Sequence, residues 1–410
     1  MEQFKIVTYP HQDVPATDLS AFCEAEAKKA HDFHASFDVY AETPLTSLPG
    51  LAKALGVKEV RIKDESYRFG LNAFKVLGGS YALGRYIAKT LGEDISDMPA
   101  TRILSDEVRE KLGEVTFVTA TDGNHGRGVA WAANKLGQKA VVHMPKGSSQ
   151  SRFDNLAKEG AQVTIEEVNY DDCVRMAAAE AEQTEHGVIV QDTAWDGYEE
   201  IPSWIMQGYG TMANEAADQL RQIGINRPTH VFVQAGVGSL AGAVVGYFTN
   251  LFPNDPPKFV VMEARAADCL YQGALANDGK PRIVTGDLQT IMAGLACGEP
   301  NTISWDILRN HVSAFISCPD WVSAKGMRML GVPVKGDPTV ISGESGAVGM
   351  GCLDAIMCDD TYKELRDALE LNRFSQVLMF STEGNTDPLK FRRVIWDGEY
   401  PTTETPQKPY

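Results

Sequence analysis

The sequence of 410 residues has no long apolar run, no excess of positive charge and no Cys-x-x-Cys pair. Its most apolar stretch, PTHVFVQAGVGSLAGAVVGYF, is interrupted by glycines and a glutamine, which disfavours a membrane-spanning helix. The N-terminal residues MEQFKIVTYPHQDV lack the basic and then apolar segments of a signal peptide. We therefore expect a cytoplasmic protein without a membrane partner.

The charge balance excludes another class of partner. The 38 basic and 55 acidic residues give a formal net charge of −17, and no basic cluster offsets it. This charge repels nucleic acids, although backbone amides can still bind a small anion. The seven cysteines are scattered, so the sequence predicts neither a zinc site nor a disulfide framework, and we expect no metal.

What the sequence does contain is an alternation of apolar and amphipathic segments. Strands are expected at 60–66, 115–120, 139–145, 162–168, 187–192, 229–236, 258–264 and 376–384, with helices between most of them. This pattern predicts an α/β fold of two open, mostly parallel sheets, each flanked by helices. We expect a large discontinuous domain of residues 1–80 and 190–410, and a small domain of residues 81–189.

Lys75 lies in RFGLNAFKVLGG, between a phenylalanine and a run of apolar and small residues. On an apolar helix face its amine would be partly desolvated, which lowers a lysine pKa and makes the amine a nucleophile. The alternative is an ordinary surface lysine, because a long side chain can bury its stem while its charge stays in water.

In open α/β sheets, ligands bind at the carboxyl ends of strands, and four predicted strand ends carry polar or glycine-rich segments. In TATDGNHGRG, Gly123 and Gly126 permit tight turns, and amides at the helix start can hold a carboxylate or phosphate. Asp122 beside this turn predicts either an acid–base group or a helix N-cap. His125 is typical of a ring that packs and hydrogen-bonds locally, with a catalytic role as the alternative.

The other three strand ends are weaker signals when each is taken alone. QAGVGSLAG, residues 234–242, predicts either a phosphate-binding nest or close packing of a helix against a strand. It lacks the full glycine spacing of a dinucleotide site and the lysine of a P-loop. Asp192 in VQDTAWDGY, and Ser381 and Thr382 in STEGNTD, have turn formation as their usual explanation.

Together, a desolvated lysine, a phosphate nest, an asparagine-bearing turn and a terminal hydroxyl indicate one cofactor, pyridoxal 5'-phosphate (PLP). Its aldehyde needs a lysine, its phosphate a nest, and its ring nitrogen and phenolic oxygen a partner each. The chain resembles the PLP-dependent family of serine and threonine dehydratases and tryptophan synthase β-subunits. The segments that carry this resemblance follow the family's order along nearly the whole chain: TPLTSLPGLAKALGVKEVRIKDES, NAFKVLGG, DGNHGRG, GYGTMANEAADQL, QAGVGSLAG, SGESGAVG and STEGNTD.

The resemblance implies a role for each residue at a matching position, with PLP in the cleft between the two domains. The implied cofactor-binding residues are Lys75 and Phe74, Asn124 at the phenolic oxygen, Gly236, Val237, Gly238 and Ser239 around the phosphate, and Ser381 or Thr382 at the pyridine nitrogen. The implied substrate-binding residues are Thr121, Asp122, Gly123, His125 and Asp192. The turn at 121–125 would receive the substrate carboxylate.

Departures from the dehydratase pattern indicate one branch of the family, the diaminopropionate ammonia-lyases. Dehydratases that release water have a small residue in place of Asp122, and they lack QDTAWDGY in this form. The implied reaction is α,β-elimination of D- and L-2,3-diaminopropionate through aminoacrylate to pyruvate and two ammonia molecules. Lys75 would take the α-proton of the L-isomer and Asp122 that of the D-isomer, while Asp192 holds or protonates the β-amine.

Other functions stay open at this point. A serine/threonine dehydratase or a β-replacement enzyme would use the same scaffold, and a non-catalytic ligand-binding protein is an alternative of another class. An NAD-dependent oxidoreductase is disfavoured by the incomplete glycine fingerprint. The resemblance also implies a homodimer and places Cys269 and Cys297 beside the site, where they could pair. A cytoplasmic location disfavours that disulfide.

Overall fold

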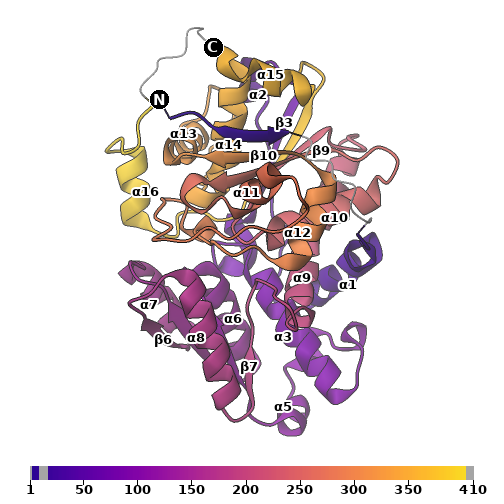
Figure 1. Ribbon diagram of the computed structural model, residues 1–410. Helices are drawn as coiled ribbons and strands as arrows, with labels where there is room; N and C mark the ends of the chain where they lie inside the picture. The colour runs from indigo at the N-terminus through magenta and orange to yellow at the C-terminus, as the bar shows by residue number, and fades with distance from the viewer. Residues whose placement is uncertain (1, 9–16, 403–410) are drawn as a thin grey trace.

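The computed structural model describes residues 2–8 and 17–402, and the strands of this part of the chain form two separate sheets (Figure 1). The strands are β1 (Lys5–Thr8), β2 (Leu45–Ser47), β3 (Glu59–Asp64), β4 (Thr116–Ala120), β5 (Lys139–Met144), β6 (Gln162–Ile165), β7 (Gly187–Ile189), β8 (His230–Gln234), β9 (Lys258–Ala264), β10 (Val312–Cys318) and β11 (Gln376–Ser381). The seven-stranded sheet has the order β1-β10-β9-β8-β11-β3-β2, and the four-stranded sheet has the order β6-β5-β4-β7.

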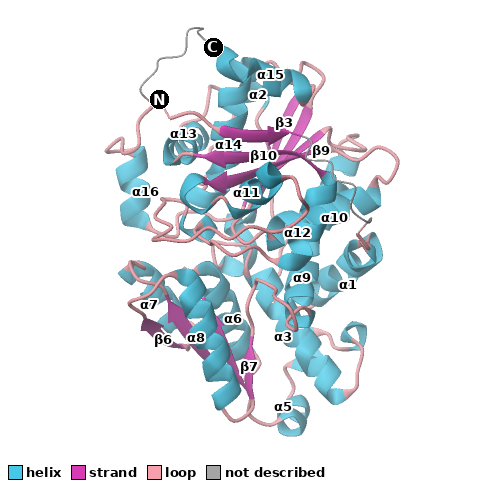
Figure 2. Cartoon of the chain, in the orientation of Figure 1, coloured by secondary structure: helices cyan, strands magenta, loops and turns pink. Residues whose placement is uncertain are grey.

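Helices pack around both sheets, as Figure 2 shows. The α-helices are α1 (Glu24–Ala35), α2 (Pro49–Leu55), α3 (Val76–Leu91), α4 (Ala100–Ile103), α5 (Asp106–Leu112), α6 (Asn124–Lys135), α7 (Gln150–Lys158), α8 (Tyr170–Gln183), α9 (Glu200–Gln222), α10 (Ser239–Leu251), α11 (Cys269–Ala276), α12 (Thr302–His311), α13 (Asp320–Gly331), α14 (Glu344–Cys358), α15 (Lys363–Ala368) and α16 (Pro388–Ile395). The prediction of an α/β fold with two helix-flanked sheets is confirmed.

Both sheets are mostly parallel. Every pairing in the four-stranded sheet is parallel, and in the larger sheet only the edge strands β1 and β2 run antiparallel to their neighbours. All residues of the interior strands β4 and β8 are buried. Strands covered on both faces have continuous apolar sequences, which is why apolar runs identified them.

Three strands of the larger sheet were not predicted from the sequence: the short edge strands β1 and β2, and β10. Helix α12 ends at His311 and β10 begins at Val312, so no glycine or proline marks the change from helix to strand. Strand prediction depends on such turn residues, and here they are missing. The division into domains near residues 80 and 190 stays a prediction.

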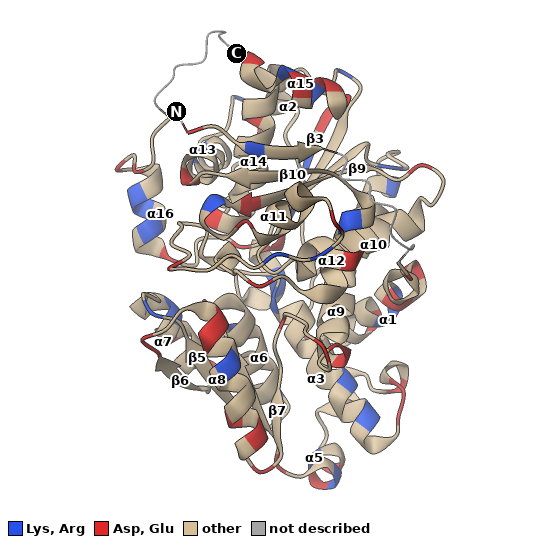
Figure 3. Ribbon diagram, viewed as in Figure 1, with Lys and Arg blue, Asp and Glu red and all other residues tan. Residues whose placement is uncertain are grey.

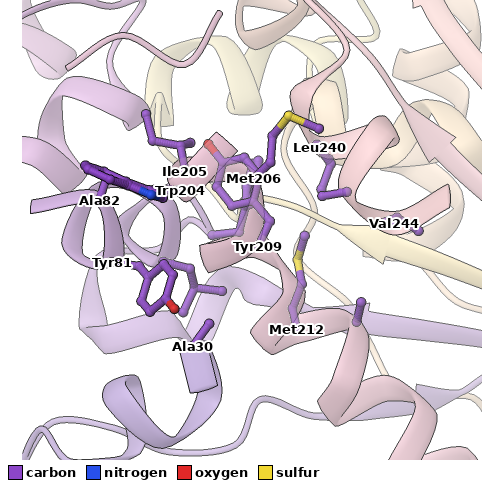
Figure 4. Packing of buried hydrophobic residues seen from close by; sticks show 14 of the residues in the cluster. Ala30, Tyr81, Ala82, Trp204, Ile205, Met206, Tyr209, Met212, Leu240 and Val244 are labelled. Atoms are coloured by element: carbon purple, nitrogen blue, oxygen red, sulfur yellow. The ribbon is translucent and has the colours of Figure 1, made fainter. Parts of the chain in front are cut away.

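Helices α3 and α9 pack closely and fix the start of α3. Ile205 and Tyr209 of α9 belong to the buried cluster at this contact (Figure 4). The two backbones approach so closely that a Cβ atom on Gly208 would lie 2.4 Å from the carbonyl oxygen of Leu77. Lys75 directly precedes α3, so this glycine contact sets where its side chain begins.

Four buried charged residues link three parts of the fold: strand β3, the segment between β3 and α3, and helix α9. They are Lys63, Glu65, Arg68 and Glu215. The guanidinium of Arg68 lies 2.8 Å from a carboxylate oxygen of Glu65 and 2.8 Å from one of Glu215. The Lys63 ammonium lies 2.6 Å from the same Glu215 oxygen, and all four side chains are almost completely buried. Burial opposes the charge of Arg68, but the two glutamates outweigh it and raise the pKa of the guanidinium.

Replacing Arg68 by methionine is expected to lower the free energy of unfolding by about 3–5 kcal/mol, because it leaves two buried carboxylates with one cation. Urea denaturation of the cofactor-free protein measures this loss. The control is Arg102→Met, which breaks a half-exposed pair with Glu93 and should cost less than about 1 kcal/mol. Equal effects of the two substitutions would contradict the prediction.

Basic and acidic residues occur on the same helices, for example on α8 and α15 (Figure 3). None of the helices in the described ranges has both the length and the apolar character needed to cross a membrane. Among the same residues, no group of three His, Cys, Asp or Glu side chains is placed to hold a metal ion.

Candidate active site

A pocket lies where the carboxyl ends of strands from both sheets meet, as expected for ligand sites in such sheets. Most of the residues predicted for the site line it: Phe74, Lys75, Thr121, Asp122, Asn124, His125, Asp192, Gly236, Val237, Gly238, Ser239 and Thr382. Gly123 and Ser381 are the two predicted residues that do not. The fold therefore brings together segments that are about 300 residues apart in the chain.

Lys75 is a partly buried cation with a carboxylate partner. Its Nζ donates a hydrogen bond to Oδ2 of Asp192 and lies 5.5 Å from the centre of the Phe74 ring. Burial lowers the pKa of the Lys75 ammonium, but Asp192 more than offsets this, and the net shift is upward. The expectation of a lowered pKa is therefore wrong, because it did not include the partner carboxylate.

Asp192 is held in place by residues on three sides. Its Oδ1 accepts a hydrogen bond from the Tyr170 hydroxyl at 3.1 Å, and its Oδ2 lies 3.9 Å from Nδ1 of His125. Burial raises the pKa of Asp192, but Lys75 outweighs burial and the net shift is downward. His125 Nε2 donates to the carbonyl oxygen of Val190 at 2.8 Å, and burial lowers the pKa of this ring. The ring is therefore neutral and packs locally.

Asp122 is not the N-cap of α6. Gly123 occupies that position, and the hydroxyl of Thr121 accepts hydrogen bonds from the amides of Gly123 (2.9 Å) and Gly126 (3.0 Å) at the helix start. Asp122 instead pairs with Arg152 of α7, whose Nη1 lies 2.9 Å from Oδ2 and 3.1 Å from the carbonyl oxygen of Asp122. Burial opposes the charge of Arg152, but Asp122 and other carboxylates outweigh it and raise the pKa of the guanidinium.

Asn124 connects the two halves of the pocket. Its Nδ2, at the start of α6, donates a hydrogen bond to Oε2 of Glu383, just after β11. The other oxygen of Glu383 accepts from the amide of Ser345 at 3.3 Å, and Glu383 is buried. The pocket thus contains a third carboxylate in addition to Asp122 and Asp192.

The loop between β8 and α10 has the form of an anion cradle. Gly238 has a φ of +103°, a left-handed conformation that favours glycine. A Cβ atom on Gly236 would lie 3.1 Å from the carbonyl oxygen of Gly294, so the loop packs tightly. Within the described chain, the amides of residues 236–239 donate no hydrogen bond and remain available to an anion at the start of α10.

The hydroxyl of Ser239 already has partners. It donates to the carbonyl oxygen of Asp192 and accepts from Nδ2 of Asn301 at 2.8 Å. At this position the backbone amide, rather than the hydroxyl, is free for a phosphate. The first of these hydrogen bonds ties the start of α10 to the segment that carries Asp192, and the second ties it to the start of α12.

Thr382 and Ser381 face different surroundings. Thr382 lines the pocket, and its Oγ1 accepts a hydrogen bond from Nε2 of Gln234 at 2.8 Å. Its carbonyl oxygen accepts from the amide of Phe74 at 3.0 Å, which joins the end of β11 to the lysine segment. Ser381 does not line the pocket, and its hydroxyl donates to that of Ser342 at 2.9 Å.

The residues present fit PLP. The pocket offers a lysine amine for the aldehyde, four free amides for the phosphate, and the Thr382 hydroxyl for the ring nitrogen. The buried hydroxyl of Ser345, also on the pocket wall, has no hydrogen-bond partner in the described residues. A buried polar group without a partner is costly, and a bound ligand is one explanation for it.

Sequence reasoning missed several residues of the pocket: Tyr170, Gln234, Leu240, Gly294, Leu295, Ser345 and Glu383. Gln234, Ser345 and Glu383 lie inside segments quoted for the family resemblance, so the segments were found but not these side chains. Tyr170 and the Asp122 partner Arg152 belong to α8 and α7, which the sequence marked only as amphipathic helices. No strand-end signal could have found them.

Cys269 and Cys297 lie close together without forming a disulfide. Both thiols are free, and the Sγ of Cys269 lies 3.8 Å from the carbonyl oxygen of Cys297. Cys297 lines the pocket, and burial raises the pKa of both thiols well above the ordinary value. Thiols with raised pKa values are poor nucleophiles at neutral pH.

Comparison with known proteins assigns the chain to a family. Residues 37–360 match the family described as pyridoxal-phosphate dependent enzyme. The chain is 53% identical over 367 residues to a diaminopropionate ammonia-lyase of Salmonella typhimurium, covering 89% of this chain and 91% of the relative. It is 49% identical over 380 residues to that of Escherichia coli K12, covering 92% and 93%.

Solved structures agree with this assignment. The selenomethionine holo form of the E. coli diaminopropionate ammonia-lyase superposes with a TM-score of 0.89 at 45% identity, covering 97% of this chain and 98% of that one. The same enzyme with an aminoacrylate–PLP azomethine reaction intermediate gives 0.87, with the same coverage. Maize serine racemase, at 21% identity and a TM-score of 0.67 over 91% and 95%, shares the fold. By its sequence, its fold and its pocket, the chain belongs to the family of pyridoxal-phosphate dependent enzymes.

Proposed function

We propose that the protein is an ammonia-lyase that converts D- and L-2,3-diaminopropionate and one water molecule to pyruvate and two ammonia molecules. The observation that carries this proposal is the charge of the pocket. Three carboxylates, Asp122, Asp192 and Glu383, surround the single lysine, Lys75. A diamino acid brings one more ammonium group than serine or threonine, and these carboxylates would balance it. The two relatives near 50% identity are both named for this reaction.

PLP, when bound, supplies an electron sink for the electron pair left at Cα. The residues of this chain position the substrate and move its protons. The amides of Asp122, Asn124 and His125 would hold the substrate carboxylate, because those of Thr121 and Gly123 already donate hydrogen bonds, and the amides of residues 236–239 would hold the phosphate. Asn124 and Thr382 would face the phenolic oxygen and the ring nitrogen. Ser381, which contacts Ser342 instead, is the less suitable partner for that nitrogen.

For the L-isomer, the contact between Lys75 and Asp192 provides a path for the proton. Lys75 Nζ, in its neutral amine form, would take the proton from Cα and pass it to the ionised Oδ2 of Asp192, its hydrogen-bond partner. Asp192 then gives the proton to the β-nitrogen, because an amine leaves readily only when protonated. Tyr170 holds the other oxygen of Asp192 and so orients the carboxyl for this transfer.

For the D-isomer, the base must come from the other side of the cofactor plane, and Asp122 is the candidate. Its pairing with Arg152 fixes the orientation of the carboxylate, as a positioned base requires. Neutral, packed His125 would contribute shape and a polar edge near Asp192 rather than a proton.

The test is to compare pyruvate formation from D- and L-diaminopropionate, L-serine and L-threonine by the purified PLP-loaded protein. We expect kcat/KM for either diaminopropionate isomer to exceed that for serine by more than about 100-fold, because serine leaves the carboxylates of the pocket without their cation. Faster turnover of serine or threonine would contradict the proposal and identify the protein as a serine/threonine dehydratase. A β-replacement enzyme would need a second substrate for turnover.

Arg152→Gln is expected to reduce kcat/KM for D-diaminopropionate about 10- to 100-fold, because Asp122 loses its charge partner and its fixed orientation. Turnover of the L-isomer should change by less than about threefold. The matched control is Lys146→Gln, which removes a cation paired with Glu167 at the exposed surface. An equal loss with both isomers would show that Arg152 acts on the whole pocket.

We also propose, from the likeness to the family, that the protein is a cytoplasmic homodimer with a small domain at residues 81–189. The small sheet occupies residues 116–189, which agrees with this division. Light scattering coupled to gel filtration measures the mass in solution.

A further inference from the structure

A second cavity, of about 570 Å³, lies on the other side of the active-site wall. Its lining comes from α8, from residues 193–195 and from the segment 281–302 before and at the start of α12. Figure 1 shows α8 in front of the small sheet, close to the loops of the larger half. A cavity of this size can hold a small organic molecule.

The two cavities are lined by residues that adjoin along the chain. Tyr170 lines the active site and its successor Asp171 lines the second cavity. Likewise, Asp192 lines the active site and its successor Thr193 lines the second cavity. On the third segment, Cys297 faces the active site, and Glu299 faces the second cavity. A ligand in the second cavity would therefore contact the immediate neighbours of active-site residues on two segments, and a residue two positions from one on the third.

Hydrogen bonds between these segments would transmit such contact. Oδ2 of Asp171 accepts from the amide of Gly298 at 3.2 Å, which ties α8 to the segment that follows Cys297. The Thr302 hydroxyl and amide both contact the carbonyl oxygen of Ala194 at 3.4 Å. Displacing any of the three segments would shift the Tyr170–Asp192 pair, whose hydrogen bond is 3.1 Å long.

The chemistry of the cavity selects one class of ligand. Its walls are largely apolar, with Val174 and Ala178 on one side and Ile283 and Pro300 on the other, and Trp195 presents an indole ring. The Trp195 ring is fixed by stacking on Tyr198, with centroids 4.3 Å apart. Aromatic rings and apolar walls favour a hydrophobic molecule, and an indole face attracts a cation.

The charges of the cavity are mainly negative. Asp171, Glu182 and Glu299 line it, against the single cation Arg175. Arg175 is already paired, at 2.7 Å from both Glu299 and Asp172. Burial, followed by Glu299, raises the pKa of Asp171 to about 6, so Asp171 is charged above neutral pH. The remaining negative charge complements a positively charged ligand.

We propose that this cavity is an effector site for a small hydrophobic ammonium cation, and that binding there changes catalysis through the three segments that line both cavities. The effect on catalysis rests on the proposed function, whereas binding does not. The cation must carry an apolar or aromatic group of a size that Ala178, Trp195 and Ile283 can enclose. An anion of the same shape should be rejected by Asp171 and Glu182.

The experiment uses the PLP-loaded protein and benzyltrimethylammonium, a cation that cannot react with an aldehyde. Isothermal titration calorimetry at about pH 8 is expected to show saturable binding of one molecule per chain, with Kd on the order of 1 mM for so small a probe. Binding of 3-phenylpropionate, an anion of similar shape, should be at least about tenfold weaker. A saturating probe is expected to change kcat or KM for diaminopropionate at least about twofold.

Two variants test the location. Ala178→Trp fills the cavity from the half-exposed face of α8, and we expect at least about tenfold weaker probe binding with unchanged basal activity. Glu182→Gln removes one charge and should weaken binding about two- to fivefold, whereas the control Glu185→Gln, on an exposed residue outside the cavity, should have no effect. Circular dichroism verifies folding of each variant.

Several results would overturn the proposal: no saturable binding, equal binding of 3-phenylpropionate, or unchanged binding to both Ala178→Trp and Glu182→Gln. Competition between the probe and substrate for one site would place binding in the active site instead. Binding with unaltered kcat and KM would refute the effector role. If the protein fails to turn over diaminopropionate, the calorimetric comparison still decides whether the cavity binds the cation, so the two proposals fail separately.

Discussion

Lys75→Ala is expected to lower kcat for both isomers of diaminopropionate by at least about 1,000-fold and to remove the covalent attachment of PLP. The loss has two causes, because Lys75 is the amine for the cofactor aldehyde and, for the L-isomer, the group that takes the Cα proton. Absorption spectra before and after borohydride reduction report the covalent link independently of turnover. A variant that still retains reducible cofactor would contradict the role of Lys75.

The same substitution has a second consequence that needs no cofactor. Asp192 is buried and loses its ammonium partner, so the cofactor-free variant should be less stable by about 3–5 kcal/mol at neutral pH. The pKa of Asp192 is lowered in the folded protein, so this stability is fully present above the unfolded value of about 3.9 and is lost as the pH falls through the folded pKa.

Urea denaturation across the acid range measures this difference. The gap in stability between wild type and variant should therefore shrink as the pH falls below about 4. The double variant with Asp192→Asn carries no orphaned charge and should recover part of the loss. A gap independent of pH would show that the pair contributes little.

Asp122→Asn is expected to reduce kcat/KM for D-diaminopropionate at least about 100-fold, and for the L-isomer less than about fivefold. The amide has the size of the carboxylate but cannot accept the Cα proton, so only the isomer that needs a base on this side is affected. Stereoisomer-specific assays of pyruvate release measure the two rates with one preparation.

The control for this prediction is Asp196→Asn, an exposed aspartate close in sequence to Asp192 and outside the pocket. It should leave both rates unchanged. Equal losses with the two isomers for Asp122→Asn would contradict the division of labour between Asp122 and Lys75. The exchange of Cα hydrogen with solvent deuterium would then show which isomer still loses its proton.

Much of the fold and part of the site follow from local sequence patterns. Buried parallel strands such as β4 and β8 have apolar runs with glycine-rich ends, so the segments around Asn124 and Gly236 could be assigned to one edge of a sheet. A lysine between Phe74 and small residues indicated a special environment. These features depend on residues close together in the chain.

What could not be predicted depends on tertiary contacts. Arg152 is one side chain of an amphipathic helix, and nothing in its neighbourhood indicates that it faces Asp122. The raised pKa of Lys75 depends on Asp192, which is more than 100 residues away. At the start of α6, the Thr121 hydroxyl accepts the backbone hydrogen bond that the Asp122 carboxylate could also have accepted. Strand β10 lacked a turn signal because a helix leads directly into it.

The position of β11 also has a consequence for how the protein is made. This strand is the last one among the described residues, yet it lies in the interior of the larger sheet, between β8 and β3. Until Gln376–Ser381 leaves the ribosome, both neighbours expose unpaired edges, and edges of that kind invite association with other chains. The β3–β11 pairing spans most of the chain, which makes folding slow. These edges are covered only once β11 has been synthesised, and the pocket, which includes Thr382 and Glu383 just after β11, is complete only then.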